Sequence, residues 1–181
     1  GAGYARWAQS FNLKQMAQTL NFLTERKLLD YGTLCKKTDD VTARYHELSD
    51  QIKAVETRMA EITELRKHII NYAKTREVYV AYRKAGYSKK FLAEHEADIL
   101  LHKAAKRAFD DMGIKKLPTI KSLQAEYADL LTEKKKLYPE YAAARREMRD
   151  LQMAKANVAR LLGYDEKAPE KEKEAQSNEQ R

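Results

Sequence analysis

The residues with the clearest chemical potential in this sequence are basic side chains with aromatic rings between them. Residues 66–90 hold eight Lys and Arg residues against one acid, Glu77. The basic residues are Arg66, Lys67, Lys74, Arg76, Arg83, Lys84, Lys89 and Lys90. The aromatic residues interleaved with them are Tyr72, Tyr79, Tyr82, Tyr87 and Phe91. Cations that bind phosphates beside rings that stack on bases are typical of single-strand binding.

This pattern predicts phosphate contacts from five basic residues and base stacking from two rings. The predicted nucleic-acid-binding residues are Arg76, Arg83, Lys84, Lys89, Lys90, Tyr82 and Tyr87. Three other interpretations stay open. The basic run also fits a solvated helix face or a surface for an acidic protein partner. The spacing of Tyr72, Tyr79 and Tyr82 by seven and three also fits rings packed in a core.

The histidines offer a weaker signal. His95, Asp98 and His102 follow one another at i, i+3 and i+7, but this spacing covers two helical turns, and one metal ion needs convergent ligands. A hydrogen-bonding role between helices is the simpler expectation. The sequence has one cysteine, Cys35, and no glycine-rich phosphate loop or Ser/His/Asp set. We therefore predict no catalytic residue, no metal site and no cofactor for this chain.

Four glycines predict the elements that position these residues. Gly32, Gly86, Gly113 and Gly163 each follow a helical pattern, and glycine commonly ends a helix in a left-handed conformation. The predicted helices cover Tyr4 to Asp30, Thr33 to Ala85, Ser88 to Met112 and Pro118 to Leu162. Ser88 is a plausible N-cap for the third helix. No alternating strand pattern occurs, so the predicted fold class is all-α.

Two of the predicted helices carry sustained heptads. In the second helix the apolar positions are Val41, Tyr45, Leu48, Ile52, Val55, Met59 and Ile62. In the last helix they run at alternating steps of three and four from Ile120 to Leu162, interrupted by Lys134 and Lys155. Such stripes bury a narrow seam against another helix, and polar residues within them fix the register. Pro139 should bend the last helix near Lys135 without breaking the heptad phase.

The simplest arrangement is an elongated, antiparallel, coiled-coil-like helical hairpin. The expected domains are an N-terminal helix (1–31), the hairpin (32–163) and a disordered charged tail (164–181). Within the hairpin, heptad helices 33–85 and 119–162 flank a helical tip at 86–118. The alternative is a parallel homodimer formed through either seam.

The net charge of +8 is concentrated in one part of the chain. Residues 66–121 hold fourteen basic and six acidic side chains, whereas residues 1–65 are balanced. The mean hydropathy is −0.76, and no apolar run is long enough for a membrane span or a secretory signal, so a cytoplasmic protein is expected. The first methionine is Met16, which suggests a piece of a longer protein.

Several stretches resemble the C-terminal region of relaxases, the mobilisation nucleases of conjugative and mobilisable elements. They are residues 74–79 (KTREVY), 82–91 (YRKAGYSKKF), 101–106 (LHKAAK) and 116–127 (KLPTIKSLQAEY). The similarity covers about residues 13–163. It implies a parent protein that nicks one strand at a transfer origin with a tyrosine nucleophile and remains attached to the 5′ end.

The resemblance also implies a metal held by a histidine cluster with a His-x-His element in a separate catalytic domain. Here no two of the four histidines are closer than seven residues, so no catalytic tyrosine or metal ligand is carried over. The implied function is a non-catalytic helical module that assists binding of single-stranded or transfer-origin DNA, or docking to a protein of the transfer machinery. The alternative is a protein-interaction scaffold or dimerisation spacer without nucleic-acid affinity.

Overall fold

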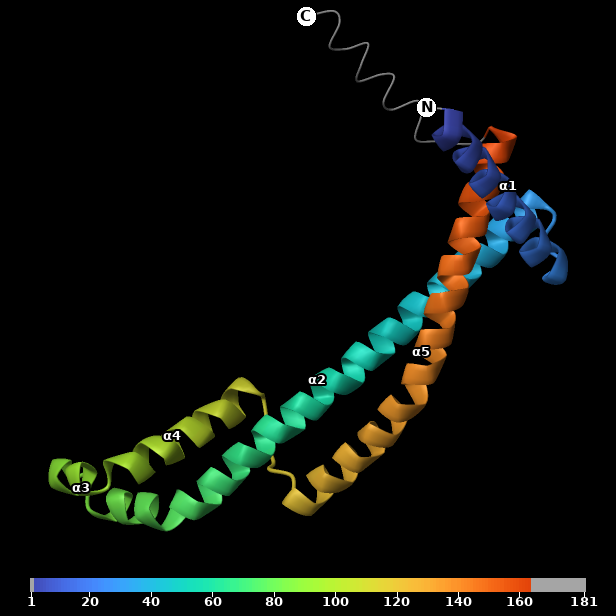
Figure 1. The fold of residues 1–181 in the computed structure, drawn as a ribbon. Helices are drawn as coiled ribbons and strands as arrows, with labels where there is room; N and C mark the ends of the chain where they lie inside the picture. Colours follow the sequence, from blue (N-terminus) through green and yellow to red (C-terminus); the bar gives the residue numbers. More distant parts are fainter. Residues whose placement is uncertain (1, 164–181) are drawn as a thin grey trace, which may run out of the picture. The chain divides into compact units, whose positions relative to one another are not determined.

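The computed structural model describes residues 2–163, apart from the side chains of residues 7–11. This part of the chain forms five helices, coloured along the sequence in Figure 1. They are α1 (Ala2–Glu25), α2 (Tyr31–Lys84), α3 (Lys89–Glu94), α4 (Glu96–Asp111) and α5 (Ile120–Leu162). The described residues contain no strand, which confirms the predicted all-α class. The predicted tail, 164–181, lies outside the described residues.

The chain divides into two compact units. Unit 1 comprises residues 1–49 and 139–181, and unit 2 comprises residues 50–138. Both α2 and α5 contribute to each unit. The expected division, which separates residues 1–31 from a hairpin at 32–163, stays a prediction. The helix α1 shares a core with both heptad helices.

In unit 1, α1 covers the paired ends of α2 and α5. The core combines residues from all three helices and the connection between α1 and α2: Leu23, Leu28, Leu34, Val41, Leu151 and Ala154. The Tyr45 and Tyr141 rings stack with centroids 5.2 Å apart, and Lys37 Nζ lies 3.9 Å from Glu147 Oε1. Because the partner numbers fall along α5 as they rise along α2, the two helices are antiparallel.

In unit 2, α2 packs against both α5 and α4. Arg58 of α2 binds Glu126 of α5, and α4 lies alongside the second half of α2 (Figure 1). The core is formed by Ile62, Leu65, Ala105, Phe109 and Leu123. The helical hairpin predicted from the heptads is therefore confirmed.

The seam residues behave largely as their heptad positions predict. Of the seven predicted in α2, six are buried and Tyr45 is half-buried. Lys134, which interrupts the apolar stripe of α5, places Nζ 3.2 Å from Glu56 Oε1 of α2. The helix α5 runs without interruption through Pro139, so the heptad phase survives the proline as expected.

The first predicted boundary is wrong. The helix α1 ends at Glu25 rather than Asp30, and Lys27 takes the left-handed conformation (φ 56°) without a glycine. Gly32 does not end a helix but lies in the first turn of α2. The reason is a cap: Asp30 Oδ2 accepts a hydrogen bond from Thr33 N at 2.8 Å, which starts α2 earlier than predicted.

The third predicted helix is also divided. Residues 88–112 form α3 and α4, separated at His95, whose backbone (φ −127°, ψ 27°) is not helical. Ser88 is confirmed as an N-cap, since its Oγ accepts a hydrogen bond from Phe91 N at 3.4 Å. The left-handed glycines predicted at the other helix ends are also confirmed: Gly86 (φ 66°), Gly113 (φ 68°) and Gly163 (φ 72°).

Candidate nucleic-acid interface

A row of aromatic rings holds α3 and α4 against the second half of α2. The His102 ring of α4 is stacked between Tyr72 and Tyr79 of α2, with centroid distances of 4.6 Å and 4.3 Å. The row continues from Tyr79 to Tyr82 and then to Phe91 of α3, each step being 6.1 Å. We call Tyr72, Tyr79, Tyr82, Phe91 and His102 the ring ladder.

His102 is the buried polar centre of this ladder. It is only 3% exposed, and its Nδ1 lies 3.0 Å from Thr75 Oγ1. The hydroxyl of Thr75 also donates a hydrogen bond to Asn71 O at 2.7 Å, so this polar centre is anchored to the backbone of α2. Burial, reinforced by the positive charge of Lys106, lowers the pKa of His102 below its ordinary value of 6.5. The imidazole therefore favours its neutral form.

Tyr82, predicted to stack on bases, is placed inside the ring ladder. Its ring is only 6% exposed, because it lies in the ladder and Lys103 Nζ sits 5.7 Å from its centroid. Tyr72 and Tyr79 are half-buried and stack on His102, which agrees with the alternative interpretation of these residues as packed rings.

Tyr87 is placed differently. Its side chain is 54% exposed, the largest exposure among the five aromatic residues interleaved with the basic run. The residue follows Gly86 in the turn after α2 and has a left-handed backbone (φ 58°). Its ring packs edge-on against Tyr82, with centroids 5.2 Å apart and an interplanar angle of 85°. Tyr87 is thus a single exposed ring in contact with the buried Tyr82 of the ring ladder.

The predicted phosphate-binding residues are all available to solvent. Arg76, Arg83, Lys84, Lys89 and Lys90 are exposed, as are the other three basic residues of 66–90. Among residues 2–163, none of these eight side chains forms an ion pair. An open depression of about 420 Å³ lies on α2, lined by Arg76, Glu77, Val80, Ala81 and Lys84.

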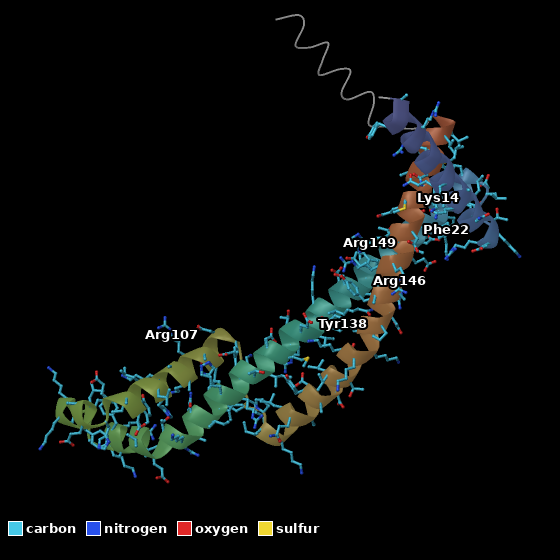
Figure 2. The ribbon with its side chains drawn as sticks, viewed as in Figure 1. Lys14, Phe22, Arg107, Tyr138, Arg146 and Arg149 are labelled. Atoms are coloured by element: carbon cyan, nitrogen blue, oxygen red, sulfur yellow. The ribbon has the colours of Figure 1, made fainter. Side chains whose placement is uncertain are left out.

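The structure adds three basic residues that the sequence analysis did not select. Lys103, Lys106 and Arg107 are exposed on α4, and Figure 2 shows Arg107 extending from the side of α4 that faces away from α2. Lys106 and Arg107 follow Lys103 by three and four residues, which places them on one side of α4, but nothing in the sequence links α4 to the second half of α2. With the predicted five they form what we call the basic surface: Arg76, Arg83, Lys84, Lys89, Lys90, Lys103, Lys106 and Arg107.

The basic residues of α2 and α4 border the same ring ladder. Arg76, Tyr79 and Arg83 are three and four residues apart, so they share one side of α2. Tyr79 stacks on His102, and the charge of Lys106 acts on that imidazole one turn along α4. The rings therefore bring together two helices whose outer side chains are cationic.

The histidine spacing does not produce a shared site. His95 turns to the Phe91 ring, with centroids 4.4 Å apart, whereas His102 faces Thr75 of α2. Within the described part of the chain, no three His, Cys, Asp or Glu side chains gather as they would around a metal ion. The same residues contain no helix with the length and apolar character that crossing a membrane requires.

Comparisons with known proteins add no family. No protein-family model matches the chain, and neither a curated protein nor a solved structure matches it. The resemblance to relaxases therefore stays a prediction from the sequence.

Proposed function

We propose that this chain is a helical DNA-binding module in which the basic surface holds phosphate groups. The observation that carries the proposal is that all eight side chains of the basic surface are exposed and that, within the described residues, none of them forms an ion pair. Two of these residues, Arg83 and Lys84, also stabilise α2, because cations in the last turn of a helix interact favourably with its dipole. The other six basic residues do not lie in the last turn of a helix.

The physical basis of binding would be electrostatic. Each Lys or Arg that neutralises a phosphate releases a condensed counterion, so affinity should fall steeply with salt concentration. The cations are anchored on helices that the ring ladder packs together, so little of their backbone has to be ordered on binding. Such contacts position a nucleic acid without reading its sequence.

Following the resemblance in residues 74–127, we further propose that the module serves a DNA relaxase and does not itself cut DNA. In this role it would assist DNA binding or docking to the transfer machinery while a separate domain performs strand transfer. The resemblance supports this assignment, and the exposed cations are compatible with it.

The proposal is tested by fluorescence anisotropy with labelled DNA and a double charge reversal, Arg83→Glu with Lys84→Glu. We expect the double variant to bind at least about tenfold more weakly and to show a shallower salt dependence. The matched control is Lys36→Glu with Lys53→Glu, two exposed residues of α2 outside the basic surface. Unchanged affinity in the first variant, or an equal loss in the control, would sink the proposal.

A protein-interaction scaffold is the second candidate, and unit 1 supplies its observation. Leu13 and Leu20, seven residues apart on α1, are 72% and 53% exposed, and Met153 of α5 is 64% exposed. Exposed apolar side chains on a helix often mark a surface for another helix. Light scattering of the purified chain tests the self-association form of this candidate, and Leu13→Glu with Leu20→Glu should then return a dimer to monomer.

A further inference from the structure

We infer that the basic surface binds the backbone of duplex DNA in preference to single strands. This inference rests on the proposed function and specifies its substrate. It differs from the expectation drawn from the sequence, in which rings beside cations pointed to single-strand binding.

The first step is the position of the rings. Proteins that bind single strands without sequence preference stack successive bases on exposed aromatic side chains. Here the rings contact one another: Tyr72 and Tyr79 stack on His102, and Tyr82 stacks on Phe91 and meets Tyr79 edge to face. Tyr82 is buried, and Tyr72 and Tyr79 are half-buried with one face of each ring against His102, so the ladder offers no row of exposed rings for successive bases.

The second step concerns the remaining ring. Tyr87 is exposed, but its edge-on contact with Tyr82 and its left-handed backbone fix it at the turn after α2. A single ring gives no platform for successive bases. Stacking therefore cannot offset the entropy lost when a flexible strand is ordered.

The third step is the arrangement of the cations. Arg76 and Arg83 are seven residues apart on one helix, which corresponds to about 10.5 Å along its axis. Lys103 and Lys106 lie on the helix packed beside it, and packed helices are about 8–10 Å apart. The backbone positions of these cations are thus held in two rows, one on α2 and one on α4.

Such an array fits a stiff polyanion better than a flexible one. A duplex carries one negative charge per roughly 1.7 Å of its axis, about twice the linear density of a single strand. Its phosphates also keep their spacing without help from the protein. With phosphate contacts as the main attraction, the denser and stiffer lattice should bind more tightly.

The experiment compares labelled duplex and single-stranded oligonucleotides of the same sequence, about 20 nucleotides long, between about 50 and 200 mM salt. We expect the duplex to bind at least several-fold more tightly across this range, and a second duplex of unrelated sequence to bind equally well. Tyr87→Ala should leave both affinities within about twofold of the original chain. Tyr127→Ala, which removes an exposed ring of α5 outside the basic surface, is the matched control.

The outcomes separate the two proposals. Tighter duplex binding that is indifferent to Tyr87 supports the inference. Equal or tighter single-strand binding, or a loss of affinity in Tyr87→Ala but not in Tyr127→Ala, overturns the duplex preference and leaves the proposed function standing. Absence of binding to either DNA at about 50 mM salt overturns both.

Discussion

Two parts of α2 treat charge in opposite ways. Where α2 pairs with α5, cations meet acids across the seam: Arg58 donates to both carboxylate oxygens of Glu126, at 2.7 Å and 3.0 Å, and Lys134 binds Glu56. In the described residues, every ion pair between helices links α2 to α5. At residues 66–84 of α2, by contrast, no Lys or Arg side chain forms an ion pair within the described residues, and the contact with α4 includes the stacked rings of the ladder.

The difference shows how one helix can pair with another helix along one part of its length and present free cations along another part. Ion pairs at a partly exposed seam add little stability but favour one register. The ring ladder needs no charge to hold α4, so the cations around it stay available to an external anion. The following predictions test this division of roles.

The largest effect is expected when the ladder is broken. Tyr82→Ala removes a buried ring that touches Tyr79, Tyr87 and Phe91, and should lower the free energy of unfolding by about 3 kcal/mol. Urea unfolding followed by circular dichroism measures this change. Tyr87→Ala, which removes a half-exposed ring at the end of the cluster, should cost much less. An equal decrease in the free energy of unfolding in the two variants would contradict the conclusion that Tyr82 is the main packing contact of the ring ladder.

The next prediction concerns pH. The pKa of His102 is lowered in the folded protein, so between that value and the unfolded value near 6.5 the unfolded state binds more protons. The stability that depends on neutral His102 is therefore complete above about pH 6.5 and is lost as the pH falls through the folded pKa.

Urea unfolding at a series of pH values measures this effect. His102→Phe keeps a ring between Tyr72 and Tyr79 but cannot titrate, so the acid-induced loss should be smaller in this variant. His46→Phe, an exposed position of α2, serves as the control and should keep the original pH dependence. A profile that His102→Phe leaves unchanged would assign the acid sensitivity to another group.

A smaller and more diagnostic effect comes from two arginines of the same helix. Arg58→Ala should reduce the free energy of unfolding by about 1 kcal/mol, because it leaves Glu126 without its partner, and should leave DNA affinity unchanged. Arg76→Ala should do the reverse, with little change in stability and weaker DNA binding. The free energy of unfolding and the DNA affinity should be measured in both variants. Equal changes in the two variants would contradict the separate roles of the two arginines.

The smallest effect is expected at the polar interruption of the seam. Lys134→Leu completes the apolar stripe of α5, while Glu56 keeps the hydrogen bond that Tyr138 donates at 2.6 Å. We expect a gain in stability of a few tenths of a kcal/mol, visible as a slightly higher urea midpoint. A loss above about 1 kcal/mol would show that the Lys134 pair contributes more than register.

The sequence predicted the parts of this fold that depend on local or periodic signals. Heptad spacing predicts both seam helices. The N-cap at Ser88 and the left-handed Gly86 that follows α2 are also predicted correctly, because each depends only on residues within the same helical turn. The end of α1 was missed because Lys27 adopts a conformation usually left to glycine. The cap at Asp30 follows a recognisable local pattern, since Thr33, whose N–H it accepts, lies three residues later.

The candidate site depended on contacts that no local pattern contains. His102 is 23 residues from Tyr79 in the chain, and only the packing of α4 on α2 stacks their rings. The same packing buries Tyr82 and adds Lys103, Lys106 and Arg107 to the basic surface. Charge could be located from the sequence, whereas the orientation of the rings required the tertiary structure.

The ring ladder also has a spectroscopic consequence. Stacked phenol and imidazole rings in a fixed chiral arrangement give circular dichroism in the near ultraviolet, a signal that is lost when aromatic packing loosens even if the helices persist. Because Tyr72, Tyr79 and Tyr82 lie at the contact between α2 and the segment of α3 and α4, their share of this signal, added to that of the stacked Tyr45–Tyr141 pair, depends on the attachment of α4. The chain thus carries its own optical probe of whether the two rows of cations are held side by side.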